Sequence, residues 1–277
     1  MMIVSTLDEL RSARLLLDGK LGLVPTMGYL HEGHISLARR AKAECHYVAV
    51  SIFVNPMQFG PNEDLSKYPR DLDRDLHLLE DAGVDLVWTP TPEVMYPPSF
   101  QTWVEVEEMT RPLEGGQRPG HFRGVTTVVT KLFNAVQPTK AYFGQKDAQQ
   151  AAVIRQMTKD LNFPIEIVVC PIVREPDGLA MSSRNVYLDT DQRNAATVLY
   201  RSLSAAKAAY EKGERDAENL RQIMRATLAS EPLAQMQYVS CADYNTLQEL
   251  EKITGKTLLS MAVFFGKTRL IDNFVLG

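Results

Sequence analysis

The chain has 277 residues, of which 45% are hydrophobic and 23% charged, and 30 basic against 34 acidic residues give a net charge of −4. This composition excludes disorder and collagen-like repeats. We expect no signal peptide, because the first residues (MMIVS) lack a basic region followed by an apolar one. We also expect no membrane contact, because no apolar stretch reaches about 18 residues. The acidic balance argues against a nucleic-acid partner, so a bound anion such as ATP would need locally placed cations.

Three widely spaced cysteines, Cys45, Cys170 and Cys241, are odd in number. They fit a reducing, cytoplasmic setting better than a disulfide framework or a zinc site. At about 150 residues per domain, the length indicates two domains.

Strand and helix patterns alternate through the first part of the chain. The expected strands are residues 21–26, 47–54, 84–88, 140–144 and 165–170. The expected helices are residues 34–44, 69–82, 124–136 and 147–161. Four or five such units predict an α/β fold, a Rossmann-like doubly wound parallel sheet.

The pattern changes after Ser183. An apolar stripe over 195–210 predicts a helix stopped by Gly213, and Asp216 is a plausible N-cap for a second helix over 220–228. With strands expected near 237–242 and 258–265, this part reads as a smaller α+β domain. The turn-rich run at 174–178 places the boundary, giving domains 1–176 and 177–277.

The segment Pro25–His34 (PTMGYLHEGH) follows the first expected strand and opens a helix. Gly28 permits a tight turn, and Gly33 lets backbone approach a ligand closely. Unpaired N–H groups and the positive dipole end of a helix favour phosphate. His31 and His34 could there stabilise charge developing on phosphate. Alone, the segment also fits a polar loop with two surface histidines.

Three other polar segments have a functional and a plain structural interpretation. Asn55 and Gln58 follow the second strand and suit a hydroxyl or carboxylate, but they also fit an Asn-Pro turn. Lys146 can reach phosphate oxygens, or it is a solvated lysine on a capped helix. Ser182, Ser183 and Arg184 resemble a phosphate clamp on a mobile loop, or an ordinary polar loop.

Two charged clusters are weaker candidates. Residues 118–124 (RPGHFRG) either add to a phosphate field or form a structural loop. Asp71, Asp73 and Asp75 could suggest a metal site, but acidic residues in a first helical turn favour the helix dipole, and we take that interpretation. No P-loop and no G-x-G-x-x-G pattern occurs, which leaves the usual nucleotide-fold interpretations without their main support.

In order along the chain, PTMGYLHEGH, SIFVNPMQFGPNEDL, YFGQKDAQQ, GLAMSSRNVYL and FFGKTRLIDN resemble motifs of the pantothenate synthetase family over essentially the whole length. H-x-G-H also occurs in nucleotidylyltransferases and class I aminoacyl-tRNA synthetases, and the combination is far more specific. The resemblance implies a ligase that joins pantoate to β-alanine through pantoyl adenylate, releasing AMP and pyrophosphate. It also implies a cytoplasmic homodimer, a C-terminal lid, and ATP with Mg²⁺.

The resemblance carries roles to matching residues. It implies His34, His31 and Lys146 as catalytic residues, with His34 the conventional proton donor. Pantoate is assigned to Gln58 and Gln150, and β-alanine to Gln58. The residues implied for ATP are Met27, Gly28, Tyr29, Leu30, His31, Glu32, Gly33, His34, Gly144, Gln145, Lys146, Asp147, Val173, Met181, Ser182, Ser183 and Arg184. Gln145 departs from the glutamate of many relatives, without touching an essential role.

Two other functions compete with this interpretation. A nucleotidylyltransferase acting on a phosphate ester would need more cations around its acceptor than two glutamines and apolar residues provide. A non-catalytic nucleotide sensor would need His31, His34 and Lys146 only for binding, which a turnover assay distinguishes. A tRNA synthetase is disfavoured because no basic anticodon-binding extension occurs.

Overall fold

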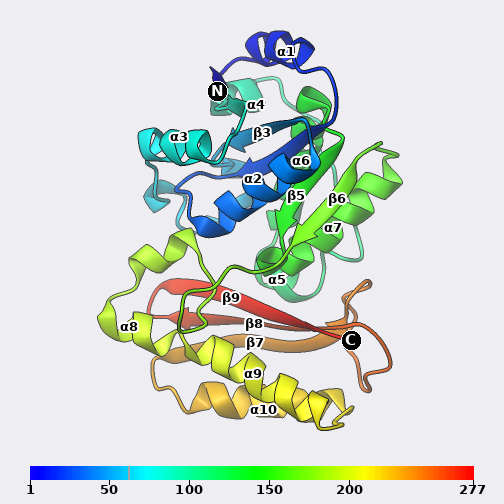
Figure 1. Cartoon of the computed structure of the whole chain (residues 1–277). Helices are drawn as coiled ribbons and strands as arrows, with labels where there is room; N and C mark the ends of the chain where they lie inside the picture. The colour runs from blue at the N-terminus through cyan, green and yellow to red at the C-terminus, as the bar shows by residue number, and fades with distance from the viewer. Residues whose placement is uncertain (62) are drawn as a thin grey trace. The chain divides into compact units, whose positions relative to one another are not determined.

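A computed structural model describes residues 1–61 and 63–277, and these residues form two compact units. The first unit contains residues 1–145 and 150–171, and the second contains residues 146–149 and 172–277. Each unit has a sheet with helices packed on it (Figure 1). The boundary expected between residues 176 and 177 stays a prediction.

The first unit is built on a six-stranded sheet in which every neighbouring pair is parallel. In spatial order its strands are β1 (Met2–Val4), β4 (Leu86–Trp88), β3 (Tyr47–Ile52), β2 (Leu21–Thr26), β5 (Lys140–Gly144) and β6 (Glu166–Cys170). The longer helices are α1 (Leu7–Leu15), α2 (Glu32–Glu44), α3 (Leu72–Asp81), α6 (His121–Val136) and α7 (Ala148–Asp160). Shorter helices and turns are α4 (Pro92–Met95), α5 (Leu113–Gln117), η1 (Pro56–Gln58), η2 (Leu65–Lys67) and η3 (Gln145–Asp147).

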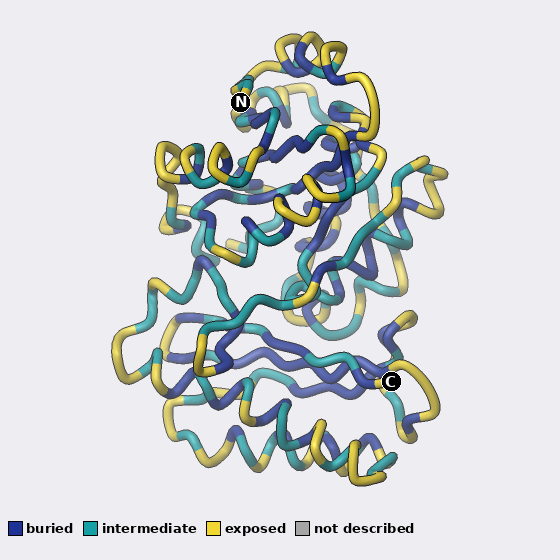
Figure 2. Tube along the Cα trace, viewed as in Figure 1, coloured by how far each residue is buried: buried dark blue, intermediate teal, exposed yellow. Residues whose placement is uncertain are grey.

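Both faces of this sheet are covered by helices. Leu23 and Ala49 belong to a core that includes residues of α1 and α6, whereas Val24 and Val50 belong to a core that includes α2 and α3. Successive strand side chains point to opposite faces, so strands buried on both sides need continuous apolar runs such as Tyr47–Ile52. Figure 2 shows these strands buried and the outer helix surfaces exposed.

The second unit contains an antiparallel sheet of β7 (Ala234–Asp243), β8 (Thr257–Phe265) and β9 (Thr268–Leu276), in that order. Helices α9 (Val198–Glu211) and α10 (Ala217–Ala229) share a core with it, to which β8 contributes alternate residues such as Met261 and Val263. The shorter helices are η4 (Ser183–Tyr187) and α8 (Thr190–Ala195).

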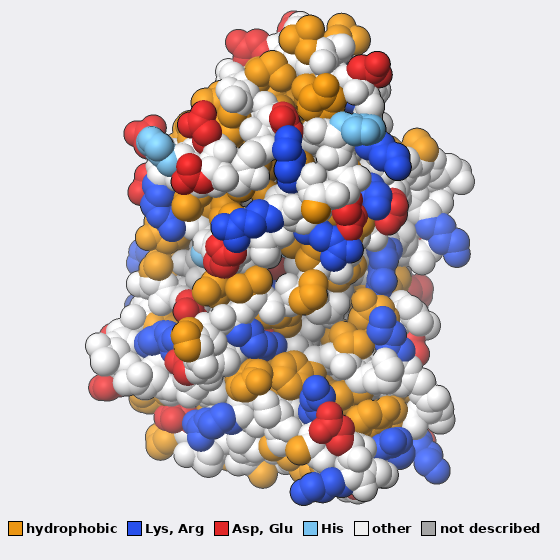
Figure 3. Space-filling model, in the orientation of Figure 1, with side chains coloured by type: hydrophobic (Ala, Val, Ile, Leu, Met, Phe, Trp, Pro, Cys, Tyr) orange, Lys and Arg blue, Asp and Glu red, His pale blue; other side chains and the backbone are white. Residues whose placement is uncertain are grey.

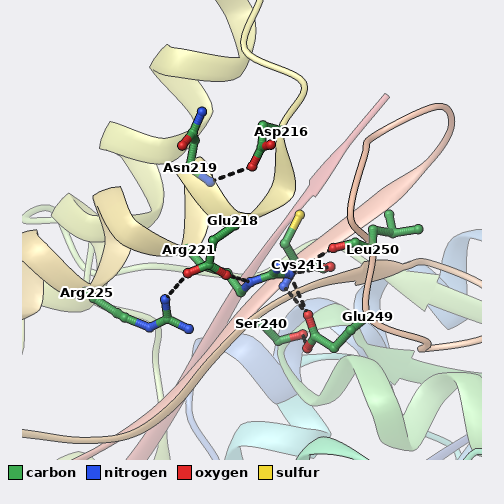
Figure 4. A network of polar contacts seen from close by, with 9 residues as sticks. All are labelled: Asp216, Glu218, Asn219, Arg221, Arg225, Ser240, Cys241, Glu249 and Leu250. Atoms are coloured by element: carbon green, nitrogen blue, oxygen red, sulfur yellow. Dashed lines mark hydrogen bonds and ion pairs between the residues drawn. The ribbon is translucent and has the colours of Figure 1, made fainter.

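A polar network ties α10 to β7 and to the loop that follows β7 (Figure 4). Arg221 donates to the Glu218 carboxylate at 2.7 Å, to Glu249 at 2.8 Å and to the Leu250 carbonyl at 3.1 Å. Ser240 donates to the same Glu249 carboxylate. The same guanidinium lies 3.4 Å from the Cys241 carbonyl oxygen of β7, so it joins α10, β7 and the loop through a planar fork that a lysine could not reproduce.

The predicted fold class is confirmed, and β2 and β5 have the expected bounds. Helix α9 is followed by Gly213 at φ 104°, and Asp216 caps α10 by accepting from the Asn219 N–H, both as expected. Strands β1 and β9 and helix α1 were not expected. In the described part of the chain, no helix is long and apolar enough to cross a membrane. The face drawn in Figure 3 mixes basic and acidic side chains instead of gathering one sign.

Candidate functional site

Three of the predicted site segments follow neighbouring strands. Residues 27–34 follow β2, residues 53–60 follow β3, and residues 145–150 follow β5, and the strand order places β2 between the other two. Parallel strands end at the same edge of a sheet, so these segments begin at one edge (Figure 1). The chain winds outward in opposite directions from β2 and β5, and such a switch point is where open α/β sheets bind ligands.

Two histidines cap the helix that begins at this edge. His31 has extended backbone (φ −136°) and precedes the first residue of α2; its Nδ1 accepts from the Gly33 N–H at 3.1 Å. The Nδ1 of His34 accepts from the His31 N–H at 3.3 Å, and the two ring centroids are 4.1 Å apart. The pair therefore occupies the two reciprocal positions that Ser/Thr and Glu/Gln usually take in a capping box.

This geometry specifies the tautomer of both rings. A backbone N–H can only donate, so each Nδ1 is unprotonated, and in a neutral imidazole Nε2 then carries the proton. Gly33 makes the arrangement possible, because a Cβ at this position would lie 2.8 Å from His31 ring atoms. The H-x-G-H spacing thus gives two Nε2–H donors beside a helix N-terminus.

Gln58 lies at the end of η1 with its side chain oriented by Asn55. Asn55 is 1% exposed; its Nδ2 donates to Gln58 Oε1 at 3.0 Å and to the Gly124 carbonyl at 3.2 Å. Its Oδ1 accepts from the Tyr96 hydroxyl at 2.8 Å and from the Met57 N–H at 3.3 Å. Asn55 therefore uses its full hydrogen-bonding capacity within the protein, and its contact with Gln58 fixes the orientation of that amide.

The Gln58 amide reaches the first segment. Its Nε2 lies 3.2 Å from Met27 Sδ, so the segments after β2 and β3 are in contact. Because Oε1 is occupied by Asn55, Nε2 is the side that can donate to a ligand oxygen. The predicted pocket residues Met27 and Gln58 thus lie together.

His121 holds the main chain of Gln58, a supporting role that the sequence analysis did not predict. Nδ1 of His121 lies 2.8 Å from the Gln58 carbonyl oxygen, and its Nε2 lies 3.1 Å from Arg118 Nη1. A carbonyl only accepts and a guanidinium only donates, so the ring is neutral, with the proton on Nδ1. Burial, with Arg118 beside it, lowers the pKa of His121 to about 4.

Arg118 is itself paired, which bears on whether residues 118–124 bind phosphate or form a structural loop. Its Nε and Nη2 each lie 2.7 Å from a Glu63 carboxylate oxygen, a bidentate ion pair. Arg123 packs over the Trp103 ring, with its guanidinium carbon 4.4 Å from the centroid. These contacts favour the structural interpretation of the 118–124 cluster over a phosphate-binding one.

The segment after β5 is divided between the compact units. Gly144 and Gln145 lie in the first unit, Lys146 and Asp147 in the second, and Gln150 is half-buried on α7 in the first. Lys146 Nζ lies 3.7 Å from Asp147 Oδ1, and the Lys146 carbonyl accepts from Asn273 Nδ2 at 2.9 Å. Asn273 belongs to the late FFGKTRLIDN segment, for which the sequence indicated no role.

The remaining predicted ATP residues lie in the second unit. The Met181 N–H donates to the Val173 carbonyl at 3.0 Å, so these two residues are neighbours. Ser182 caps η4 by accepting from the Arg184 N–H at 3.2 Å, and Ser183 is 6% exposed. The structure therefore brings together 173 with 181–184, and 27–34 with 58, each within its own unit.

The acidic residues at the start of α3 serve the helix terminus and nearby backbone groups. Asp71 is the N-cap and accepts from the Arg74 N–H at 3.2 Å, and Asp73 lies in the first turn, as the helix-start interpretation predicts. Asp75 is different, because it is buried and faces the loop after β2. Among residues 1–61 and 63–277, no three His, Cys, Asp or Glu side chains group in a way that could hold a metal ion.

The sheet therefore has two histidines on a helix N-terminus at its switch point and a glutamine amide beside them, an arrangement typical of enzymes that bind nucleotides in open α/β sheets. The sequence model of the family described as "Pantoate-beta-alanine ligase" matches residues 2–275. A pantothenate synthetase from Roseiflexus castenholzii is 60% identical over 276 residues, covering 100% of this chain and 99% of the relative. The chain belongs to the pantoate–β-alanine ligase family and is a ligase.

Solved structures agree with this assignment. The crystal structure of pantothenate synthetase from Thermus thermophilus superposes with a TM-score of 0.95 at 48% identity, covering 99% of both chains. A pantoate–β-alanine ligase from Francisella tularensis, described as complexed with "Beta-gamma ATP" and β-alanine, has a TM-score of 0.81 at 37% identity, covering 99% of this chain and 97% of the other.

Proposed function

We propose that this ligase condenses pantoate with β-alanine at the expense of ATP through an enzyme-bound pantoyl adenylate. The observation that carries the mechanism is the His31–His34 pair at the N-terminus of α2, at the sheet's switch point. Two imidazole N–H donors beside a helix dipole suit charge that develops on an α-phosphate and on departing pyrophosphate.

The reaction proceeds in two displacements. A pantoate carboxylate oxygen attacks the α-phosphorus of ATP, the bond to the β-phosphate oxygen breaks, and pyrophosphate leaves. The amine of β-alanine then attacks the adenylate carbonyl; AMP leaves with the electron pair of the broken C–O bond, and the amine loses a proton. No covalent enzyme intermediate is needed, so catalysis depends on alignment and charge stabilisation.

Pantoate is assigned to Gln58 and Gln150. The Nε2 of Gln58 donates to an oxygen of the substrate, because Asn55 occupies the other end of the amide. β-Alanine is placed at Gln58 as well, beside the acyl group that it attacks. Residues 27–34, 144–147, 173 and 181–184 are assigned to ATP, with His34 as the proton donor and His31 and Lys146 as further catalytic residues.

ATP would enter as its Mg²⁺ complex. Mg²⁺ prefers oxygen ligands and is commonly held by substrate phosphates with one or two carboxylates. The proposed ATP residues include two carboxylates, Glu32 and Asp147. Glu32 pairs with Arg39 on α2, so Asp147, beside Lys146, would be the one to hold the ion.

The expected setting is a cytoplasmic homodimer. Buried free thiols at Cys45, Cys170 and Cys241 suit a reducing compartment. The dimer rests on the family resemblance, and sedimentation equilibrium of the purified chain measures it directly.

Isotope exchange tests the proposed mechanism. With pantoate and Mg²⁺ alone, the protein is expected to exchange labelled pyrophosphate into ATP, since the adenylate forms before β-alanine acts. Pantolactone, which lacks a free carboxylate, is the matched control and is expected to support no exchange. Mass spectrometry of the complete reaction is expected to find pantothenate and AMP; release of ADP would overturn the adenylate route.

A further inference from the structure

The carboxylate of Asp75 is buried beneath the loop that leads to the paired histidines. Asp75 lies on α3 and is 1% exposed. Its Oδ2 accepts from the Tyr29 N–H at 2.6 Å and its Oδ1 from the Leu30 N–H at 2.7 Å. Both oxygens of a side chain 45 residues away thus bond to two successive backbone amides of the candidate ATP loop.

The loop has a backbone conformation that needs such support. Gly28 and Tyr29 are both left-handed, with φ values of 81° and 51°. Tyrosine rarely adopts this conformation, because its Cβ crowds the backbone there. Successive amides in such a turn form a concave anion site. Here the anion is the protein's own carboxylate.

Arg74 supports the same contact from the surface. Its guanidinium carbon lies 5.3 Å from the centroid of the Tyr29 ring, and its Nη1 lies 3.6 Å from Asp75 Oδ1. A half-exposed cation therefore covers both the residue with the strained backbone and the carboxylate that holds it.

We propose that Asp75 is a positioning residue for His31 and His34. Its carboxylate holds Tyr29 and Leu30, so that the next residue, His31, enters α2 in the extended conformation that caps the helix and orients both imidazoles. This inference rests on the proposed function for its catalytic consequence, whereas the contact itself can be tested without turnover.

The geometry argues against a direct catalytic or metal-binding part for Asp75. Its two oxygens are engaged by backbone donors, and almost none of the residue is accessible. Burial raises the pKa of Asp75, while the Leu30 and Tyr29 N–H groups and Arg74 oppose the rise. An ionised carboxylate is the form that accepts at both oxygens, as this contact requires.

Asp75→Asn tests the proposal because it keeps the shape and replaces one acceptor by an N–H donor facing a backbone N–H. Pyrophosphate exchange is expected to slow about ten- to a hundredfold, the size of effect that a misplaced charge-stabilising group produces. Pantoate affinity, measured by calorimetry, is expected to stay within about twofold, and amide exchange at Tyr29 and Leu30 to accelerate. The matched control is Asp73→Asn, the same substitution at an exposed position two residues earlier on α3. It is expected to leave pyrophosphate exchange, pantoate affinity and amide exchange unchanged.

A second variant covers the case in which Asp75→Asn does not fold. Arg74 is on the surface, so Arg74→Ala is expected to fold, to raise amide exchange at Tyr29 and to slow pyrophosphate exchange about two- to fivefold. Wild-type turnover in a folded Asp75→Asn protein, or unchanged Tyr29 and Leu30 exchange in either variant, overturns the inference. If the wild type itself shows no pyrophosphate exchange, the proposed function fails instead, and amide exchange still decides whether Asp75 holds the loop.

Discussion

His31 and His34 have a structural task at the start of α2, and the proposed mechanism gives them a chemical one as well. Each Nδ1 accepts a backbone N–H at the start of α2, and this contact is what leaves the proton on each Nε2. The rings are therefore oriented and tautomerically defined before a substrate arrives, which is the preorganisation that charge-stabilising groups need.

His34→Asn separates these two tasks. The asparagine Oδ1 can replace Nδ1 as acceptor from the His31 N–H, but the variant has no counterpart of Nε2–H. We expect the melting temperature to stay close to wild type and kcat for pyrophosphate exchange to fall about 10²–10³-fold, as for other lost charge-stabilising donors. His34→Ala, which removes both groups, is expected to lose the same activity and some helix stability too. Wild-type turnover in either variant would remove His34 from the mechanism.

Removing the side chain of Gln58 or Gln150 is expected to weaken the binding of pantoate and not that of ATP. Gln58→Ala and Gln150→Ala each leave a buried substrate oxygen without a partner, which costs about 1–3 kcal/mol, or about tenfold to over a hundredfold in affinity. Titration calorimetry is expected to show weaker pantoate binding with little change for an ATP analogue. The reverse pattern would mean that the two sites have been exchanged.

At the scale of elements, η1 is clamped by α6 and by the turn that precedes α6, where Arg118 is paired with Glu63. His121, the first residue of α6, and Arg118, in the turn that precedes it, hold the Gln58 carbonyl. Gly124 lets the helix approach so closely that a Cβ there would lie 2.2 Å from the Met57 carbonyl oxygen. The neutral His121 ring belongs to this clamp, because protonation at Nε2 would set an N–H against Arg118.

This clamp predicts a pH dependence of stability. The pKa of His121 is about 4 in the fold, against about 6.5 in an unfolded chain. The unfolded chain therefore binds more protons between these values, so the free energy of unfolding falls as pH drops from about 6.5 to 4. Between pH 7 and 5 the loss from this group is on the order of 2 kcal/mol.

Urea unfolding of wild type and His121→Asn checks this expectation. Asparagine can still donate to the Gln58 carbonyl but does not titrate, so its profile is expected to be flatter over about pH 7 to 5. Arg118, Glu114 and Glu63 are the charged groups facing His121, and they are unchanged in the variant. Parallel profiles for the two proteins would contradict a buried neutral His121.

At the scale of the whole molecule, the candidate ATP residues are distributed over both compact units. Residues 27–34 lie in the first, and residues 146–147, 173 and 181–184 lie in the second. If one nucleotide uses both sets, a non-hydrolysable ATP analogue is expected to slow amide exchange both at 27–34 and at 180–185. Protection confined to the first set would argue against a nucleotide role for Ser182, Ser183 and Arg184.

Local signals in the sequence predicted most of the first unit. β2 and β5 were expected residue for residue, because each is a short apolar run with a turn or helix signal on both sides. β9 was missed although Gly266 and Lys267 form a two-residue connection from β8, a recognisable hairpin signal.

The supporting residues of the site had no comparable signal. Asp75 and the Leu30 amide are 45 residues apart, and His121 and the Gln58 carbonyl are 63 apart. A side chain that bonds a distant main-chain group leaves no trace in periodicity or spacing, so Asp75 resembled an ordinary first-turn residue and His121 part of a basic loop. The family resemblance indicated direct ligands, not the groups that orient them.

At His31, the N-cap of α2, the demands of the proposed catalytic role and of thermal stability conflict. Serine and aspartate are stronger helix N-caps than most side chains, so position 31 is one where selection for heat resistance alone would favour replacing the imidazole. A variant such as His31→Asp would gain helix stability and lose a proposed catalytic donor. If variants of this chain are selected for thermostability without an activity screen, we expect replacements of His31 at the start of α2 among them, and those variants to be inactive.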